Sequence, residues 1–175
     1  MYLDRAMNRL ADLELKAAQA YLRAAQAFET REFKQFFAEM AREELDHARA
    51  ILEMMASVKP STYDLAVTEA KLEEAAGAIA RCSSALINHE DLEAAFVAIA
   101  EMEGTEINSI YESVLHYYTN QLLPSHGVEV FHQSTEVHIR MLREAAGRFG
   151  LEPGVRGQLE GLAVKPLGYY KVTKL

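Results

Sequence analysis

The sequence predicts an all-α protein, a four-helix bundle with a long crossover between its second and third helices. Half of the 175 residues are hydrophobic, and the chain has no Trp and only four Pro. A mixture this rich in Ala, Leu, Glu and Met favours helix over sheet. Apolar residues also recur at alternating spacings of three and four, the period of a helix with one buried face. A chain of this length fits one compact domain, so we expect residues 1–150 to form the bundle and residues 151–175 a C-terminal tail.

The first two helices are expected to form an antiparallel hairpin. Residues 2–28 carry an apolar seam in which Glu14 is the only charge. After a short break, in which Thr30 can cap the N-terminus, the second helix runs to about residue 57 and stops before Pro60. So short a break makes the two helices antiparallel. Glu14 and Glu44 each lie about 15 residues from the break, so a rise of ~1.5 Å per residue places them level.

The crossover and a third helix come next. Residues 68–82 are rich in Ala and Glu, with Lys71 among them, so we expect an extra helix within the crossover of residues 61–88. The third helix begins near Asp91, and its otherwise apolar seam contains Glu103 and Glu106. Two acidic residues therefore fall in core positions of one helix.

The fourth helix lies between two breaks in the pattern. Pro124 and Gly127 mark a loop before it, and Gly150 ends it. Its apolar seam spans residues 128–149, and His138 occupies the position in that seam that matches His47 in the second helix.

The pair Glu44 and His47 is the motif that points to chemistry. The two residues are three apart in a strongly helical segment and therefore share one helix face. The rest of that face is apolar, with Met40 before the pair and Ile51 after it. A charged carboxylate in a core position is costly unless a partner compensates it. A buried salt bridge would satisfy the pair, but the compensation that we favour is a metal ion.

Six residues make up the predicted site, because each is ionisable, occupies an apolar seam and lies near the middle of its helix. Carboxylate and imidazole ligands together suit iron, manganese or zinc, and di-iron carboxylate sites are built on the facing helices of four-helix bundles. Four carboxylates also balance two divalent cations when both His are neutral. Without metal these carboxylates would repel one another, so we expect the metal-free protein to be the less stable form. The six residues are Glu14, Glu44, His47, Glu103, Glu106 and His138.

Composition and charge exclude several classes of partner. The formal net charge is −8 and no cluster of Lys and Arg stands out, so we expect neither nucleic acid nor a membrane as a partner. The single Cys82 cannot form an internal disulfide, nor the paired Cys motifs of a rubredoxin domain. Residues 1–10 carry three charges without a continuous apolar run. We therefore expect a soluble, cytoplasmic protein.

Three features together form a recognisable pattern. They are residues 14–21, the segment 36–48 with its Glu-x-x-His, and Glu103-Gly104-Thr105-Glu106 with Tyr111 eight residues after Glu103. With the crossover, this pattern resembles rubrerythrin, of the ferritin-like superfamily, over residues 1–150. The resemblance implies a ferritin-like bundle with two iron ions (manganese or zinc being alternatives), four Glu as metal-centred catalytic ligands and bridges, and one nitrogen ligand from each of the two His.

The fourth helix departs from the family pattern. Where the family has a second Glu-x-x-His, this chain has Thr135-Glu136-Val137-His138. Glu136 points about 200° away from His138 around the helix and cannot replace the missing carboxylate. We reject the alternative pair Glu129 and His132, because that register would turn the apolar seam away from the core. The second metal then lacks one carboxylate, and water or the Thr135 hydroxyl is expected to fill its place.

The resemblance also implies an activity. Proteins of this family commonly reduce hydrogen peroxide at a di-iron centre while a partner returns the electrons. We therefore expect a di-iron oxidoreductase that acts on hydrogen peroxide or dioxygen with a separate electron-donor protein, or that oxidises ferrous iron. The alternative is a non-catalytic helical bundle, an assembly or adaptor protein whose metal site is degenerate at Thr135. A hydroxylase acting on an organic substrate is a weaker option.

Other residues keep two interpretations open. Tyr21 and Tyr111 are core aromatics or hydrogen-bond partners of ligand carboxylates. His132 and Glu43 are assigned to the solvated surface, and Cys82 to the core.

The tail has two Pro and an aromatic run at residues 167–172, and it either docks on the bundle or a neighbouring subunit or stays loosely attached. Flat helical faces and this apolar tail lead us to expect a homodimer.

Overall fold

The described part of the chain is entirely helical. The computed structural model describes residues 3–57, 69–87, 91–106 and 126–166, and these form six helices and no strand. The prediction of an all-α bundle is confirmed. The helices are α1 (Leu3–Ala27), α2 (Arg31–Ser57), α3 (Glu69–Ile87), α4 (Leu92–Glu106), α6 (His126–Arg148) and α7 (Pro153–Gly161).

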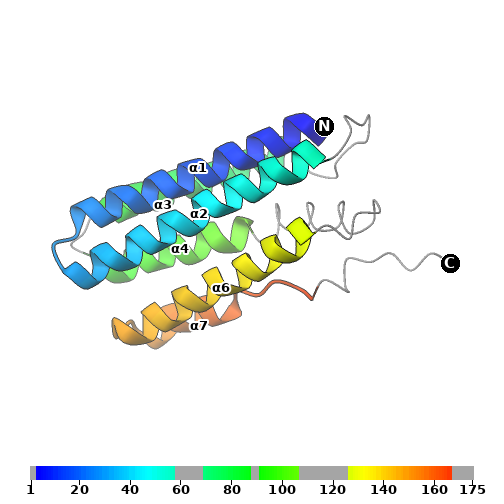
Figure 1. The fold of residues 1–175 in the computed structure, drawn as a ribbon. Helices are drawn as coiled ribbons and strands as arrows, with labels where there is room; N and C mark the ends of the chain where they lie inside the picture. The colour runs from blue at the N-terminus through cyan, green and yellow to red at the C-terminus, as the bar shows by residue number, and fades with distance from the viewer. Residues whose placement is uncertain (1–2, 58–68, 88–90, 107–125, 167–175) are drawn as a thin grey trace.

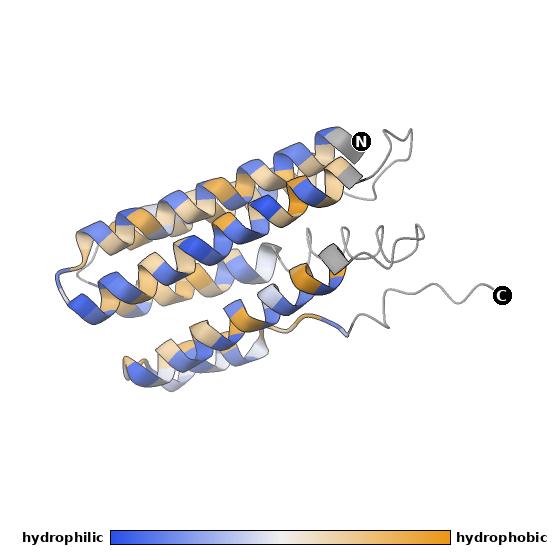
Figure 2. Ribbon diagram, in the orientation of Figure 1, coloured by the Kyte–Doolittle hydropathy of each residue, from blue (hydrophilic) through white to orange (hydrophobic). Residues whose placement is uncertain are grey.

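The helices lie in two layers. α1, α2 and α6 lie side by side in one layer, and α3, α4 and α7 lie behind them in the same order (Figure 1). α1 packs on α3, and α6 packs on α7, so the layers are joined at both edges. Hydrophilic and hydrophobic residues alternate along every helix (Figure 2), which is the pattern of helices that bury one face.

α1 and α2 form the predicted antiparallel hairpin. The helices are separated by residues 28–30, and the amide of Lys34 donates to the carbonyl of Thr30 at 3.0 Å, as in the first turn of a helix that Thr30 caps. Tyr21 of α1 and Phe37 of α2 stack with ring centroids 6.3 Å apart. Both rings are fully buried, so the interior of the hairpin is closed to water at this level.

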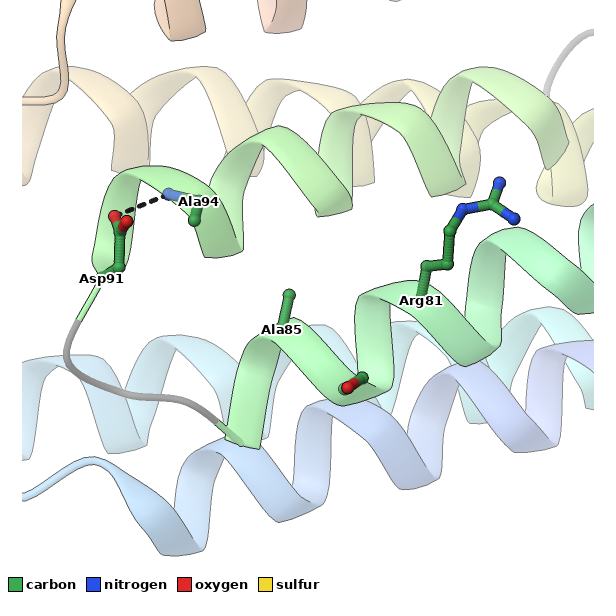
Figure 3. A pocket seen from close by; sticks show the side chains of 5 residues that line it. Arg81, Ala85, Asp91 and Ala94 are labelled. Atoms are coloured by element: carbon green, nitrogen blue, oxygen red, sulfur yellow. Dashed lines mark hydrogen bonds between the residues drawn. The ribbon is translucent and has the colours of Figure 1, made fainter.

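α3 is the helix expected within the crossover, and a side-chain cap starts the helix that follows it. Asp91 precedes α4, and its Oδ1 accepts a hydrogen bond from the amide of Ala94 at 2.9 Å (Figure 3). This is the bond by which an N-cap Asp satisfies one of the open amides of a first turn. The predicted helix start near Asp91 is confirmed. Cys82 of α3 is buried, as predicted.

α6 ends where the sequence indicates. Gly150 has a φ of +70°, in the left-handed region that Gly adopts without strain. The amide of Leu151 then donates to the carbonyl of Ala146 at 3.1 Å, and that of Gly150 to the carbonyl of Gly147 at 3.3 Å. This pair of bonds is a Schellman motif and closes the last turn of α6.

The helix α7 is a feature that the sequence analysis did not predict. It lies in the region interpreted as a tail, and it packs on α4 and α6 through Val155 and Leu159. Glu93 of α4 accepts the amide of Glu152 at 2.8 Å, just before the helix begins. Arg143 of α6 donates to the carbonyls of Leu159, Glu160 and Leu162 where the helix ends. A carboxylate at the N-terminus and a guanidinium at the C-terminus both complement the dipole of α7.

None of the helices in the described ranges combines the length and the apolar character that crossing a bilayer requires. Their apolar faces are used instead for one continuous core, which includes residues from all six helices.

Candidate metal centre

Four helices converge on one buried group of ionisable side chains. α1 contributes one carboxylate, α2 a carboxylate and an imidazole, α4 a carboxylate and α6 an imidazole. None of these residues is more than 3% exposed. Buried carboxylates are rare unless they are paired or bind a metal. The residues are Glu14, Glu44, His47, Glu103 and His138.

The two members from α2 are positioned by the helix itself. Glu44 and His47 are three residues apart, and Nδ1 of His47 lies 3.2 Å from Oε2 of Glu44. The same nitrogen lies 3.6 Å from Oε2 of Glu14, which comes from α1. His47 therefore contacts both Glu14 and Glu44. The sequence analysis expected these two carboxylates to lie level, because each is about 15 residues from the hairpin turn.

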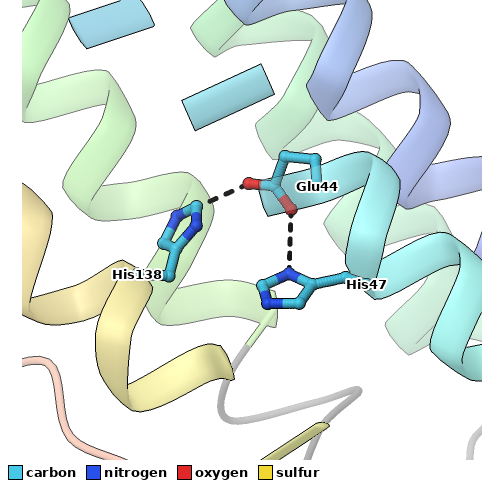
Figure 4. A group of neighbouring side chains, drawn as sticks. All are labelled: Glu44, His47 and His138. Carbon is cyan, nitrogen blue, oxygen red and sulfur yellow. Dashed lines mark hydrogen bonds and ion pairs between the residues drawn. The ribbon is translucent and has the colours of Figure 1, made fainter. Parts of the chain in front are cut away.

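His138 links the pair from α2 to α4. Its Nε2 lies 2.8 Å from Oε1 of Glu103 and 3.5 Å from Oε1 of Glu44. Glu44 therefore lies between the two imidazoles, one from its own helix and one from α6 (Figure 4). The rings of His47 and His138 have centroids 5.5 Å apart.

Tyr21 adds a hydroxyl to the same group. Its phenol donates a hydrogen bond to Oε1 of Glu103 at 2.7 Å, and both groups are buried. The sequence left two interpretations of Tyr21, and the structure contains the second one, a hydrogen bond to a carboxylate of the cluster. Such a bond fixes the orientation of the carboxylate and strengthens it as a ligand.

The protein surroundings shift the pKa values of three groups in this cluster. Burial by itself would lower the pKa of His138, but the charge of Glu103 and its hydrogen bond outweigh burial and raise this pKa. Burial would raise the pKa of Glu103, whereas the charge of His138 and hydrogen bonds from His138 and Tyr21 bring the pKa below its ordinary value. Burial, followed by the charge of Glu103, raises the pKa of Tyr21 well above its ordinary value. These shifts favour the charged forms of Glu103 and His138 and the neutral form of the Tyr21 phenol.

The donor set fits a metal ion of the iron, manganese or zinc type. Glu44, His47 and His138 each offer a ligand atom, and these atoms lie within 4.8 Å of one another. Atoms bound to one ion at about 2.0–2.2 Å are separated by about 2.8–3.6 Å from their neighbours in a tetrahedral or octahedral shell. The carboxylate–imidazole separations are 3.2 and 3.6 Å at His47 and 2.8 and 3.5 Å at His138. Only small side-chain movements would bring these atoms onto one or two ions.

Thr135 is buried one turn before His138, at the position where the sequence lacks a Glu. The residue is 3% exposed, and its hydroxyl donates to the carbonyl of Phe131 in the same helix at 2.9 Å. Its proton is thus used within α6, as is common for a Thr inside a helix. The oxygen atom keeps lone pairs, so the expectation that water or this hydroxyl fills the missing carboxylate position stays a prediction.

Two predicted site residues cannot be placed. Glu106 is the last residue of α4, and its side chain is not among those described. Tyr111 lies outside the described residues. Their roles as a ligand and as a hydrogen-bond partner stay predictions.

Two side chains that were assigned to the surface are mostly buried. His132 is 7% exposed, and its Nε2 lies 2.9 Å from the carbonyl of Lys165, in the segment after α7. The side chain of Glu43 is 12% exposed, and it accepts a hydrogen bond from the hydroxyl of Ser134 at 3.4 Å. The assignment of His132 to solvent is wrong because the segment after α7 covers it. Its place four residues after the buried Val128 was the available signal in the sequence.

A surface hollow lies between α3 and α4, away from the cluster. This pocket has a volume of about 450 Å³ and is lined by Arg81, Ser84, Ala85, Asp91 and Ala94 (Figure 3). Arg81 is also paired with Glu101. None of the residues that line this pocket belongs to the cluster.

Comparison with known proteins agrees with this arrangement. The family model described as Rubrerythrin matches residues 8–125, more than half of the chain. No curated protein and no solved structure matches the chain significantly. The matched residues include Glu14, Glu44 with His47, and Glu103, but not His138. Proteins of this family typically bind metal ions at a di-iron carboxylate site. The chain belongs to the rubrerythrin family.

Proposed function

We propose that this chain is a di-iron oxidoreductase that reduces hydrogen peroxide or dioxygen, with oxidation of ferrous iron as the closely related alternative. One observation carries the proposal: carboxylates and imidazoles from four helices meet in a buried cluster with ligand-like separations. The carboxylate ligands would be Glu14, Glu44, Glu103 and Glu106. The nitrogen ligands would be His47 and His138.

Iron bound there would supply one-electron oxidation and reduction at each ion. The protein contributes the fixed positions of the donors and the exclusion of bulk water. All five described members of the cluster are buried, and the ring of Phe131 contacts His47 with centroids 5.8 Å apart.

Protons for the reaction can be held by the chain's own groups. Reduction of one hydrogen peroxide to two waters consumes two electrons and two protons. Tyr21 keeps its hydroxyl proton, because its pKa is raised by burial and by Glu103. Its hydrogen bond to Glu103 places this proton beside a proposed carboxylate ligand. We therefore assign two roles to Tyr21. Its hydrogen bond orients Glu103, and its hydroxyl holds a proton next to this carboxylate.

The electrons would come from a separate protein. The chain has one cysteine, Cys82, which is buried in α3. One thiol cannot form the four-cysteine iron site of a rubredoxin domain. The proposal thus includes an external electron donor as a partner.

Rapid mixing tests the proposed activity. The ferrous protein, prepared without oxygen, is mixed with peroxide and separately with oxygen, and the oxidation of iron is followed by absorbance. Peroxidase activity predicts faster oxidation by peroxide and repeated turnover when an artificial reductant is added. Faster oxidation by oxygen with release of ferric mineral would instead support iron oxidation.

Thr135 favours the second candidate, a helical bundle without catalytic activity. In this case the site is degenerate at α6, where the Thr135 hydroxyl bonds to the helix backbone. Such a protein would bind at most one ion and would not turn over either oxidant. A melting temperature that neither chelation nor Glu44→Ala lowers would support this candidate and would remove the argument for metal.

A further inference from the structure

The segment after α7 links α4 to α6 next to the metal cluster. Cδ2 of Leu162 lies 3.5 Å from the place that a Cβ on Gly104 would occupy, and Gly104 follows Glu103 in α4. Three residues further along the segment, the carbonyl of Lys165 lies 2.9 Å from Nε2 of His132 in α6. Leu162 and His132 are 8% and 7% exposed. The segment therefore passes over the side of the cluster that lies between α4 and α6.

The position of the missing carboxylate lies between the cluster and this segment. Each residue of a helix is turned by about 100° from the one before it, so a step of three residues turns a side chain by about 60°. Thr135 is therefore about 60° from His138 around α6, and His132 is about 60° further in the same direction. His138 is bonded to Glu103 in the cluster, whereas His132 is bonded to the segment after α7. Thr135 thus has the cluster on one side and the segment on the other.

α7 holds this segment in place by packing between α4 and α6. It contacts both helices, whereas α4 and α6 are not a closely packed pair in the described part of the chain. α7 lies beside α4 in one layer of the bundle and behind α6 (Figure 1). Val155 and Leu159 of α7 are buried. α7 and the described residues after it therefore form one structural unit, residues 153–166, which we call the cover.

Polar bonds at both ends hold the cover on the bundle. Glu93 of α4 accepts the amide of Glu152 at 2.8 Å, just before the cover begins. Arg143 of α6 donates to three carbonyls where α7 ends, and His132 bonds to the segment that follows. None of these bonds includes a residue of the cluster. The cover can therefore detach from α4 and α6 while the cluster keeps its own contacts.

Three glycines keep α7 only marginally stable. Gly154, Gly157 and Gly161 make up one third of this nine-residue helix. A Cβ at any of the three would meet no atom within 4 Å, and none of them has a positive φ. Neither packing nor backbone geometry therefore requires glycine at these positions. Each Gly weakens a helix relative to Ala, and a helix this short is unstable on its own in water. α7 is thus helical because it is docked, and the cover unfolds when it detaches.

We propose that the cover opens as a unit, and that this opening controls access to the buried cluster from the side between α4 and α6. When the cover is docked, it keeps bulky molecules from Glu103 and His138. When the cover detaches, the position next to Thr135 opens to solvent. The glycines of α7 make this opening frequent, whereas alanines would make it rare. Access to the cluster does not depend on its chemistry, but the importance of this access for iron and oxidants rests on the proposed function.

Access can be measured in the metal-free full chain. Diethyl pyrocarbonate acylates imidazole, and mass spectrometry of peptides gives the rate of this reaction at His138, while hydrogen exchange reports the opening of α7. Gly157→Ala should slow both processes about 4-fold to 5-fold, because Ala stabilises the docked helix by its higher helix propensity. The matched control is Gly147→Ala, because Gly147 lies in α6 and its Cβ position is equally open. The control should leave the exchange of α7 and the reaction at His138 unchanged.

Loosening the cover should have the opposite effect. Arg143→Ala removes three hydrogen bonds to the end of α7 and should speed both processes about 5-fold or more. Arg140→Ala is the control on the same helix and should change neither, and circular dichroism should show all variants equally helical. If the exchange of α7 responds to the substitutions but the reaction at His138 does not, access does not pass beneath the cover and the proposal is wrong. The proposal also fails if Gly157→Ala does not slow the exchange of α7.

Iron release tests whether the cover serves the metal centre. The ferrous protein is mixed without oxygen with an excess of ferrozine, a bulky chelator, and the absorbance of the iron complex is followed. Release should slow in Gly157→Ala and accelerate in Arg143→Ala by the same factors as the reaction at His138. Equal release rates in all variants would mean that the metal leaves by another route, and would overturn the control of metal access. If the chain takes up no iron while the reaction at His138 still follows the cover, the proposed function fails and the cover stands.

Discussion

Oε1 of Glu103 lies 2.8 Å from Nε2 of His138 and also accepts the hydroxyl of Tyr21 at 2.7 Å. One carboxylate oxygen thus joins α4, α6 and α1 inside the bundle. The bond can be made only if all three helices are in register, since each group is fixed by its own backbone. We therefore expect loss of this contact to lower the stability of the fold.

Replacing Tyr21 with Phe should destabilise the metal-free protein modestly. The substitution keeps the buried ring and removes one hydrogen bond to a charged acceptor. The expected loss is about 1–3 kcal/mol in the free energy of unfolding, measured by urea denaturation. No change in stability would mean that the phenol does not bond to an ionised Glu103.

The stability of the metal-free protein should depend on pH through Glu103 and His138. The pKa of His138 is raised on folding, so its contribution is complete below about pH 6.5 and is lost as pH rises through the raised value. The pKa of Glu103 is lowered, so its contribution is complete above about pH 4.3 and is lost as pH falls through the lowered value. In the chelated protein, this pair should therefore contribute most to the free energy of unfolding between about pH 4.3 and about pH 6.5, as measured by denaturation. The natural protein should lose stability as the pH rises above this range, and His138→Gln should remove that loss.

Removal of metal should lower the melting temperature of the natural protein. A ligand at 100 times its dissociation constant contributes about 2.7 kcal/mol, and the metal-free cluster also contains repelling carboxylates. Glu44→Ala should abolish the difference between loaded and chelated protein. Glu53→Ala is the matched control, because Glu53 is a 73% exposed side chain of the same helix and should preserve the difference. Equal loss in both variants would contradict a role specific to Glu44.

Introducing the missing carboxylate should strengthen metal binding. Thr135 is buried one turn from His138, so a Glu at this position points toward the same cluster. Thr135→Glu should raise the affinity for the second ion about 10-fold or more, measured by titration of the chelated protein. Thr135→Val is the control for shape and should leave the affinity unchanged. If Val weakens binding as well, the hydroxyl of Thr135 is itself part of the site.

Arg143 should hold α7 against the bundle. Its guanidinium donates to three carbonyls at the end of α7, so Arg143→Ala should destabilise this helix by about 1–3 kcal/mol. Hydrogen exchange should then become faster in α7 while α1 and α2 keep their protection. Arg140→Ala is the control on the same helix, because the side chain of Arg140 is 66% exposed and pairs only weakly with Glu144. Faster exchange in the Arg140 variant would contradict the assignment.

The helices and the cluster follow from local patterns that are strong in this sequence. Glu14, Glu44, His47, Glu103 and His138 could be found because each interrupts an apolar seam, and the hairpin geometry sets their heights. The structure brings these five together in one buried cluster. The end of α6 was also predictable, since only Gly suits the positive φ at residue 150.

The missed features depend on contacts between segments that are distant in sequence. The residues of α7 include three Gly and one Pro, which favour irregular structure when taken alone. The helix is stabilised by Glu93 and Arg143, which lie on other helices. His132 is buried because the carbonyl of Lys165 covers it, 33 residues further along the chain. No local periodicity reports the contacts of Glu93, Arg143 or Lys165 themselves, although the place of His132 four residues after Val128 was a sign of its burial. Pro at the first turn and Val155 with Leu159 were likewise a weak sign of helix.

The metal content of the purified full chain tests the central claim most directly. Elemental analysis of protein reconstituted with ferrous iron and freed of excess metal should give about two ions per chain, as for other di-iron carboxylate bundles. His138→Ala with Glu103→Ala should reduce this value to one or less. Fewer than one ion per natural chain, together with a melting temperature that chelation does not change, would contradict the account.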